Sequence, residues 1–85
     1  MINIQVQISY LPLCSNFNEV IELFLLELNK TENINITTNA MSTVLAGDYH
    51  IVFNALQNVI FPFIQKYPSV FNITISNCCD NCTIN

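Results

Sequence analysis

Residues 34–48 read INITTNAMSTVLAGD, and this stretch decides the fold. We expect a short strand over Ile34 to Thr38, a turn at Asn39-Ala40 and another strand over Met41 to Gly47, which together form a hairpin. Gly47 is the only glycine, and we expect a positive φ there, where the hairpin leads into a helix. Asp48 is placed to cap that helix.

The segment before the hairpin predicts a strand and a helix. Apolar and polar side chains alternate from Ile2 to Tyr10, which is typical of a half-buried strand, and Pro12 is expected to end it. Ser15 or Asn16 can cap the helix that follows, with Glu19 completing a capping-box-like pair. The apolar stripe of this helix consists of Phe17, Val20, Ile21, Phe24, Leu25 and Leu28, while Leu23 and Leu26 lie off it.

The segment after the hairpin predicts a second helix and a last strand. We expect Pro62 to kink or end this helix. In the last strand, Phe71, Ile73 and Ile75 alternate with polar residues. The stripe of the second helix consists of Val52, Ala55, Leu56, Val59 and Phe63, with Phe53 and Ile60 beside it.

The element order is therefore strand, helix, strand, strand, helix, strand. Two split βαβ units of this kind predict an α+β, ferredoxin-like βαββαβ sandwich, in which two helices cover one face of an antiparallel four-stranded sheet. We expect a single domain over residues 1–77 and a cysteine-rich tail over residues 78–85.

The composition excludes several classes of partner. Charged residues make up 9% of the chain, against roughly 25% in typical soluble domains, and the net charge is −4. Lys30 and Lys66 are the only basic residues, so we expect neither nucleic-acid binding nor a polybasic membrane patch. The N-terminus lacks the basic region of a signal peptide, and no apolar run approaches the ~20 residues of a membrane span, so we expect a cytoplasmic protein.

The sheet face away from the helices is predicted to carry no charged side chain. A wet polar face is one interpretation. We favour the other, a face covered by another subunit in a homodimer or homotetramer, because a solvated sheet usually carries charges and because this domain is small. The residues predicted on this face are Gln5, Gln7, Ser9, Thr37, Ser42, Val44, Ala46, Asn72, Thr74 and Ser76.

The chain shows no catalytic constellation, so we expect a non-enzyme without a cofactor. His50 has no neighbouring cysteine or acid arranged as a triad, which favours a surface helix residue. Cys79 and Cys82 have the spacing of a zinc half-site or redox pair. Cys14 should lie a strand length away from them, so one subunit cannot assemble a four-cysteine site. We favour a loosely tied thiol tail with no bound metal over a metal or redox role.

Three segments resemble the YkoF-type family, which binds thiamine and hydroxymethylpyrimidine and is related to the wider family of small thiamine-binding proteins. They are ISYLPL at residues 8–13, NFNEVI at residues 16–21, and MSTVLAGD at residues 41–48 followed by Val52-Phe53. The first segment is similar to the family's pattern at a strand end. The second is similar to its Asn-aromatic pattern at a helix start, and the third to its ST-x-L-x-GD pattern where a strand leads into a helix. The resemblance implies a ferredoxin-like fold, non-enzymatic binding of a thiamine-like pyrimidine, and pairing of single domains.

The residue chemistry suits such a ligand. An aminopyrimidine needs hydrogen-bonding groups and an aromatic wall. A positive thiazolium would suit this acidic chain and stack on an aromatic ring. The side chains of Ser42, Thr43 and Asn16 are candidates for the hydrogen bonds. The candidate wall consists of Tyr10, Phe17 and Phe53, although plain core packing would also explain each ring.

Another function remains open, a structural or regulatory oligomerisation module without a small-molecule ligand. The two functions differ in whether Tyr10, Asn16 and Thr43 converge on one cavity. A thiol-based metal or redox protein is a third, weaker interpretation.

Overall fold

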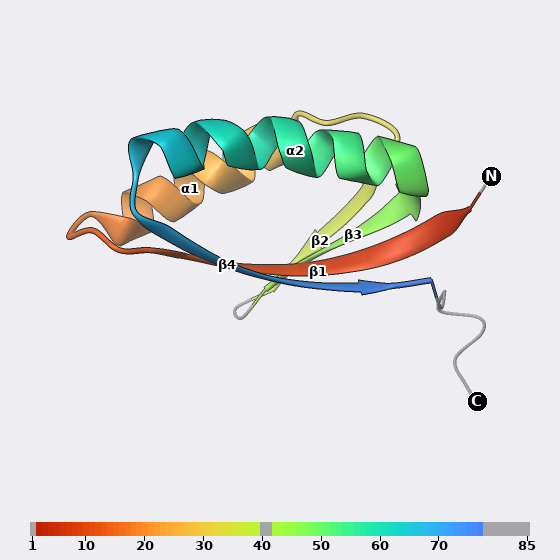
Figure 1. The fold of residues 1–85 in the computed structure, drawn as a ribbon, viewed down its shortest axis with the longest axis horizontal. Coiled ribbons are helices and arrows are strands. Elements are labelled where there is room, and N and C mark those ends of the chain that lie inside the picture. The colour runs from red at the N-terminus through yellow and green to blue at the C-terminus, as the bar shows by residue number, and fades with distance from the viewer. Residues whose placement is uncertain (1, 40–41, 78–85) are drawn as a thin grey trace.

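The computed structural model describes residues 2–39 and 42–77. The sheet order is β2-β3-β1-β4 with antiparallel pairing throughout, and both helices lie on one face of the sheet (Figure 1). The predicted ferredoxin-like α+β fold is therefore confirmed. The elements are β1 (Asn3–Pro12), α1 (Phe17–Asn29), β2 (Asn35–Thr38), β3 (Thr43–Asp48), α2 (Tyr49–Lys66) and β4 (Ser69–Ser76).

The core lies between the sheet and the helices. All five residues of the predicted α2 stripe are buried, from Val52 to Phe63. In α1, Val20, Phe24 and Leu28 are buried, whereas Phe17 at the helix start is 43% exposed. Leu23 and Leu26 are exposed, as their positions off the stripe predicted.

The two helix starts differ from one another. The Asp48 carboxylate accepts a hydrogen bond from the Ile51 amide at 3.3 Å, so the predicted cap of α2 is confirmed. At α1, the predicted side-chain capping is wrong, because the Asn16 side chain makes no cap bond. The Asn16 backbone, at φ −98° and ψ 40°, is not extended as a side-chain cap requires. Its carbonyl instead accepts the Glu19 amide at 3.1 Å.

Two of the three prolines lie within elements. Pro12 is the last residue of β1, so the prediction that it ends the strand is confirmed. β1 pairs with β3 only up to Ile8, so Pro12 has no strand neighbour on that side. We expected Pro62 to kink or end α2; it does not end the helix, which continues to Lys66. Buried Val59 and Phe63 anchor the helix on both sides of Pro62, and this packing offsets the lost hydrogen bond.

Gly47 corrects another expectation, since its φ is not positive. A Cβ at this position would lie 3.3 Å from the Asn33 carbonyl oxygen and 3.5 Å from Val52 Cγ2. Glycine is therefore needed for close approach of the chain before β2, not for its backbone conformation. Asn33 adopts the left-handed conformation instead, with φ 66°.

The hairpin and edge strand also depart from the sequence pattern. β2 begins at Asn35 rather than Ile34, and β3 begins at Thr43 rather than Met41, which lies outside the described residues. Ile73 and Ile75 are 42% and 48% exposed although they pair with core residues Ile8 and Val6 of β1. The helices contact β1 and β3 and leave β4 largely uncovered, so alternation there does not produce burial.

Candidate functional site

A small cavity lies at the hairpin end of the sheet, where α1 crosses β1 and β3. Its volume is about 110 Å³. Tyr10 of β1, Ser42 beside β3 and Thr43 of β3 line it, so three of the six predicted site residues come together there. Thr38 of β2 and Phe24 of α1 complete the walls.

The hydroxyl groups of this cavity are held by the hairpin. Ser42 and Thr43 are only 9% and 4% exposed. The Gln7 amide donates to Ser42 Oγ at 3.0 Å, and Thr43 Oγ1 lies 3.4 Å from Thr38 Oγ1. A hydroxyl has one donor and two acceptor sites, so each group keeps capacity for a ligand.

The aromatic side of the cavity belongs to a ring cluster. The Tyr10 ring stacks on Phe71 with centroids 4.2 Å apart and lies 4.9 Å from the Phe24 ring. Its hydroxyl lies 3.0 Å from Ser69 Oγ. The Tyr10 ring therefore belongs to the core packing and also lines the cavity.

The other three predicted site residues lie elsewhere. Asn16 and Phe17 are exposed at the start of α1 and do not line the cavity. Phe53 packs on Tyr49, with ring centroids 4.8 Å apart, near the start of α2. That end of α2 lies beside the start of β1, since the Tyr49 amide donates to the Ile2 carbonyl at 2.8 Å. The hairpin lies at the other end of β3.

Sequence reasoning missed several members of the cavity, among them Thr38 and Phe24. Thr38 pairs directly with Thr43, whereas the predicted turn at Asn39-Ala40 would have paired it with Met41. Phe24 was assigned to the core stripe of α1, where it is indeed 2% exposed. Nothing in the sequence shows that its ring also borders a cavity.

The open face of the sheet is uncharged, as predicted. Figure 1 shows both helices on the opposite side of the sheet. Gln7 lies between Val44 of β3 and Thr74 of β4 in the strand register, and these side chains line a depression of about 130 Å³ with Gln5 and Ser76. The centre of this face therefore consists of uncharged amides, hydroxyls and one valine.

A second uncovered surface was not predicted. It is an apolar groove between α2 and β4, in which Phe61 and Ile64 of the helix face Ile73 and Ile75 of the strand. Phe61 and Ile64 are 60% and 56% exposed. Neither residue belongs to the predicted apolar stripe of this helix, and only the placement of α2 over β1 and β3 reveals the groove.

No metal site is found within residues 2–39 and 42–77, where no three potential ligands cluster. The predicted tail cysteines, Cys78, Cys79 and Cys82, lie outside the described residues. Ser76 pairs with Gln5 near the start of β1, and Cys14 follows the opposite end of that strand. The described part of the chain therefore has the separation of Cys14 from the end of β4 that the sequence predicted.

The described helices also lack any segment long and apolar enough to cross a membrane.

Solved structures share the fold. A Streptococcus pneumoniae protein superposes with a TM-score of 0.79 at 19% identity, covering 87% of this chain and 84% of its own. A hypothetical protein from Methanocaldococcus jannaschii gives 0.77 at 22% identity, covering 94% and 84%. A Thermotoga maritima protein, described provisionally as a thiamine biosynthesis/salvage protein, gives 0.76 at 14% identity, covering 87% and 82%.

Sequence comparison places the chain in a family. No curated protein sequence matches it at a significant level. The model of the YKOF-related family matches residues 3–81, which is nearly the whole chain. The resemblance carried by the hairpin and helix starts is thereby confirmed, and the chain belongs to the YKOF-related family.

Proposed function

We propose that this domain binds thiamine or its hydroxymethylpyrimidine precursor without chemical turnover. The observation that carries the proposal is the pair of buried hydroxyls, Ser42 and Thr43, which border a cavity beside the Tyr10 ring. Membership of the YKOF-related family supports it, as does the similar fold of the Thermotoga maritima protein described provisionally in thiamine biosynthesis/salvage.

The size of the cavity favours the pyrimidine as the part that enters it. A volume of about 110 Å³ accommodates roughly one ring, whereas drug-sized ligands occupy cavities of roughly 300–1,000 Å³. Hydroxyl groups can donate to a ring nitrogen and accept from an exocyclic amino group. The thiazolium of thiamine would then remain outside, where the net charge of −4 favours a cation.

Calorimetry on ligand-free protein tests this proposal. Thiamine and hydroxymethylpyrimidine should both release or absorb heat on binding. Thr43→Val removes the hydroxyl at nearly constant volume and should weaken binding about fivefold, the effect of one hydrogen bond. Thr31→Val makes the same change at the end of α1, away from the cavity, and should leave binding unchanged. Absence of heat with either ligand at millimolar concentration would refute the proposal.

Association through the open sheet face is a second part of the proposal. We infer that two or four copies bury the face around Gln7, Val44 and Thr74 as a homodimer or homotetramer. Short uncharged side chains permit close packing of one sheet on another. A domain of 85 residues also gains stability from a partner surface.

The alternative, an oligomerisation module without a small-molecule ligand, is favoured by one observation. Asn16 does not reach the cavity that Tyr10 and Thr43 share. If the protein is oligomeric and gives no heat with either compound, this alternative replaces ligand binding.

A further inference from the structure

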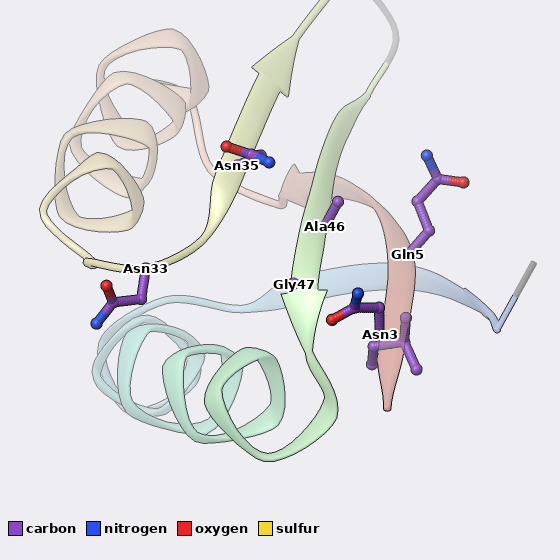
Figure 2. Close-up of a pocket in the computed structure, with 7 residues that line it drawn as sticks. Asn3, Gln5, Asn33, Asn35, Ala46 and Gly47 are labelled. Carbon is purple, nitrogen blue, oxygen red and sulfur yellow. The ribbon is translucent and has the colours of Figure 1, made fainter. Parts of the chain in front are cut away.

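A hollow lined by carboxamide groups lies near the start of β1, away from the hairpin cavity (Figure 2). Its volume is about 280 Å³. Asn3 and Gln5 come from β1, Asn35 from β2, and Asn33 from the chain just before β2. Among the described residues, no charged side chain lines the hollow. We name it the amide hollow.

The strand register gives the amide hollow its width. Gln5 and Asn35 are both paired with Ala46, one on each side of β3. Paired residues point to the same face of a sheet, and two strand spacings separate the outer residues by roughly 10 Å. The methyl group of Ala46 is the only side chain between them. A planar ring therefore fits over Ala46 with a carboxamide on either side.

Gly47 keeps the neighbouring part of the hollow open. Its missing side chain lets the backbone of Asn33 approach β3, where a Cβ would already meet the Asn33 carbonyl at 3.3 Å. The φ of 66° at Asn33 is a conformation that asparagine adopts more readily than most residues. The Asn33 carboxamide itself points away from Ala46 and Gln5 (Figure 2), so it is the backbone of Asn33 that approaches the hollow beside Gly47.

The lining determines the class of ligand. Each carboxamide has one carbonyl acceptor and an NH₂ donor, so the side chains of Asn3, Gln5 and Asn35 carry both kinds of group beside one hollow. Because no ionisable side chain of the described chain borders it, an ion would bring a charge without a compensating partner. The volume corresponds to one ring with small substituents, just below the usual range of roughly 300–1,000 Å³.

We propose that the amide hollow binds a small, neutral, planar molecule whose edge carries a hydrogen-bond donor beside an acceptor, as in a primary amide. This goes beyond the proposed binding of a thiamine-like pyrimidine and is independent of it. Gln5 and Ala46 belong to the open sheet face, so the ligand and a second subunit on that face would compete, and benzamide should bind more weakly to an oligomer that forms there. Thr43 borders the hairpin cavity and Gly47 borders the amide hollow, so the sites are separated by roughly 13 Å along β3.

Three probes of matched size test the ligand class: benzamide, benzoate and protonated benzamidine. They share one ring and differ in charge. Side-chain NH₂ signals in ¹H–¹⁵N spectra of labelled protein report directly on the carboxamides. Benzamide should shift the signals of Asn3, Gln5 and Asn35 with a dissociation constant that hardly changes with salt. No shift of these signals at about 10 mM benzamide, or equal binding of all three probes, would overturn the proposal.

Variants locate the site. Asn35→Ala removes one exposed carboxamide from the hollow and should weaken benzamide binding about fivefold. Ala46→Leu fills the hollow and should abolish binding. Asn54→Ala removes an exposed carboxamide from α2 and should have no effect. Unchanged affinity in both hollow variants would show that the probe binds elsewhere. Thr43 does not line the hollow, so Thr43→Val should leave benzamide binding unchanged. Failure of thiamine binding can therefore be distinguished from failure of this proposal.

Discussion

The Tyr10 ring stacks on the Phe71 ring with centroids 4.2 Å apart and planes inclined by only 5°. The two residues are paired across β1 and β4, and the edges of Phe24 and Phe63 pack around them. This aromatic cluster joins the edge strand to both helices. It is therefore the main packing contact that holds β4 to the helical layer, which otherwise leaves Ile73 and Ile75 exposed.

Replacing Tyr10 tests how much the cluster contributes to stability. Tyr10→Ala removes the ring and should lower the free energy of unfolding by about 3–5 kcal/mol. Tyr10→Phe keeps the ring and loses only the hydroxyl contact with Ser69, and should cost about 1 kcal/mol. Urea denaturation of both variants measures the difference. Similar losses in the two variants would mean that the hydroxyl, and not the stacked ring, is the stabilising group.

The sequence predicted the layers of this fold because periodicity depends on local geometry. The α2 stripe of Val52 to Phe63 is buried, and its spacing alone indicated that. Exposure of Ile73 and Ile75 could not be predicted, since it depends on where α2 lies across the sheet. The strand pattern correctly gave the side of the sheet but not whether a helix covers it.

The sequence predicted the candidate site correctly only at the hairpin, where residues that are close in the sequence are also close in space. Ser42 and Thr43 are adjacent in the sequence, and Tyr10 lies near them because it follows Ile8, the strand partner of Thr43, by two residues. Phe53 is separated from them because it lies near the start of α2, beside the start of β1. The amide hollow was not predicted because it places Asn35 and Gln5 on either side of Ala46 through a register that the sequence does not specify.

Pro62 should be a site where substitution stabilises the protein. Pro62→Ala restores a backbone donor inside α2 at an exposed position. Proline costs about 3 kcal/mol in a helix interior, of which up to about 1 kcal/mol is offset by its effect on the unfolded chain. We expect a gain of about 2 kcal/mol in the free energy of unfolding. Gln65→Ala, also exposed in α2, should change stability by less than about 0.5 kcal/mol. A loss of stability in Pro62→Ala would show that the helix is adapted to proline.

Even the smallest side chain at position 47 should lower the stability of the protein. Gly47→Ala adds a Cβ that meets the Asn33 carbonyl oxygen at 3.3 Å, and a backbone oxygen moves less readily than a side chain. We expect a loss of about 1 kcal/mol, at the lower end of the cost of overpacking. Thermal unfolding followed by circular dichroism measures it. Equal or higher stability of Gly47→Ala would mean that the chain at Asn33 yields without cost, since the φ of Gly47 itself permits alanine.

The last prediction concerns which uncovered surface joins the subunits. The open sheet face is uncharged around half-buried Val44, whereas the groove between α2 and β4 is more apolar and contains Ile73. Val44→Lys and Ile73→Lys introduce the same ammonium group on the two surfaces. A lysine inside an interface leaves an unpaired buried charge, which costs about 3–5 kcal/mol. If the open face is the interface, Val44→Lys should give monomer or aggregate, and Ile73→Lys should keep the oligomer of the unmodified protein.

Light scattering at micromolar concentration distinguishes the two surfaces, with circular dichroism checking that each variant is folded. Dissociation by Ile73→Lys alone would assign the interface to the groove. A monodisperse monomer of the unmodified protein would remove the need for either interface. The open face would then be a wet surface of amides and hydroxyls, whose short side chains, around Gln7 and Thr74, are sufficiently hydrated without charge.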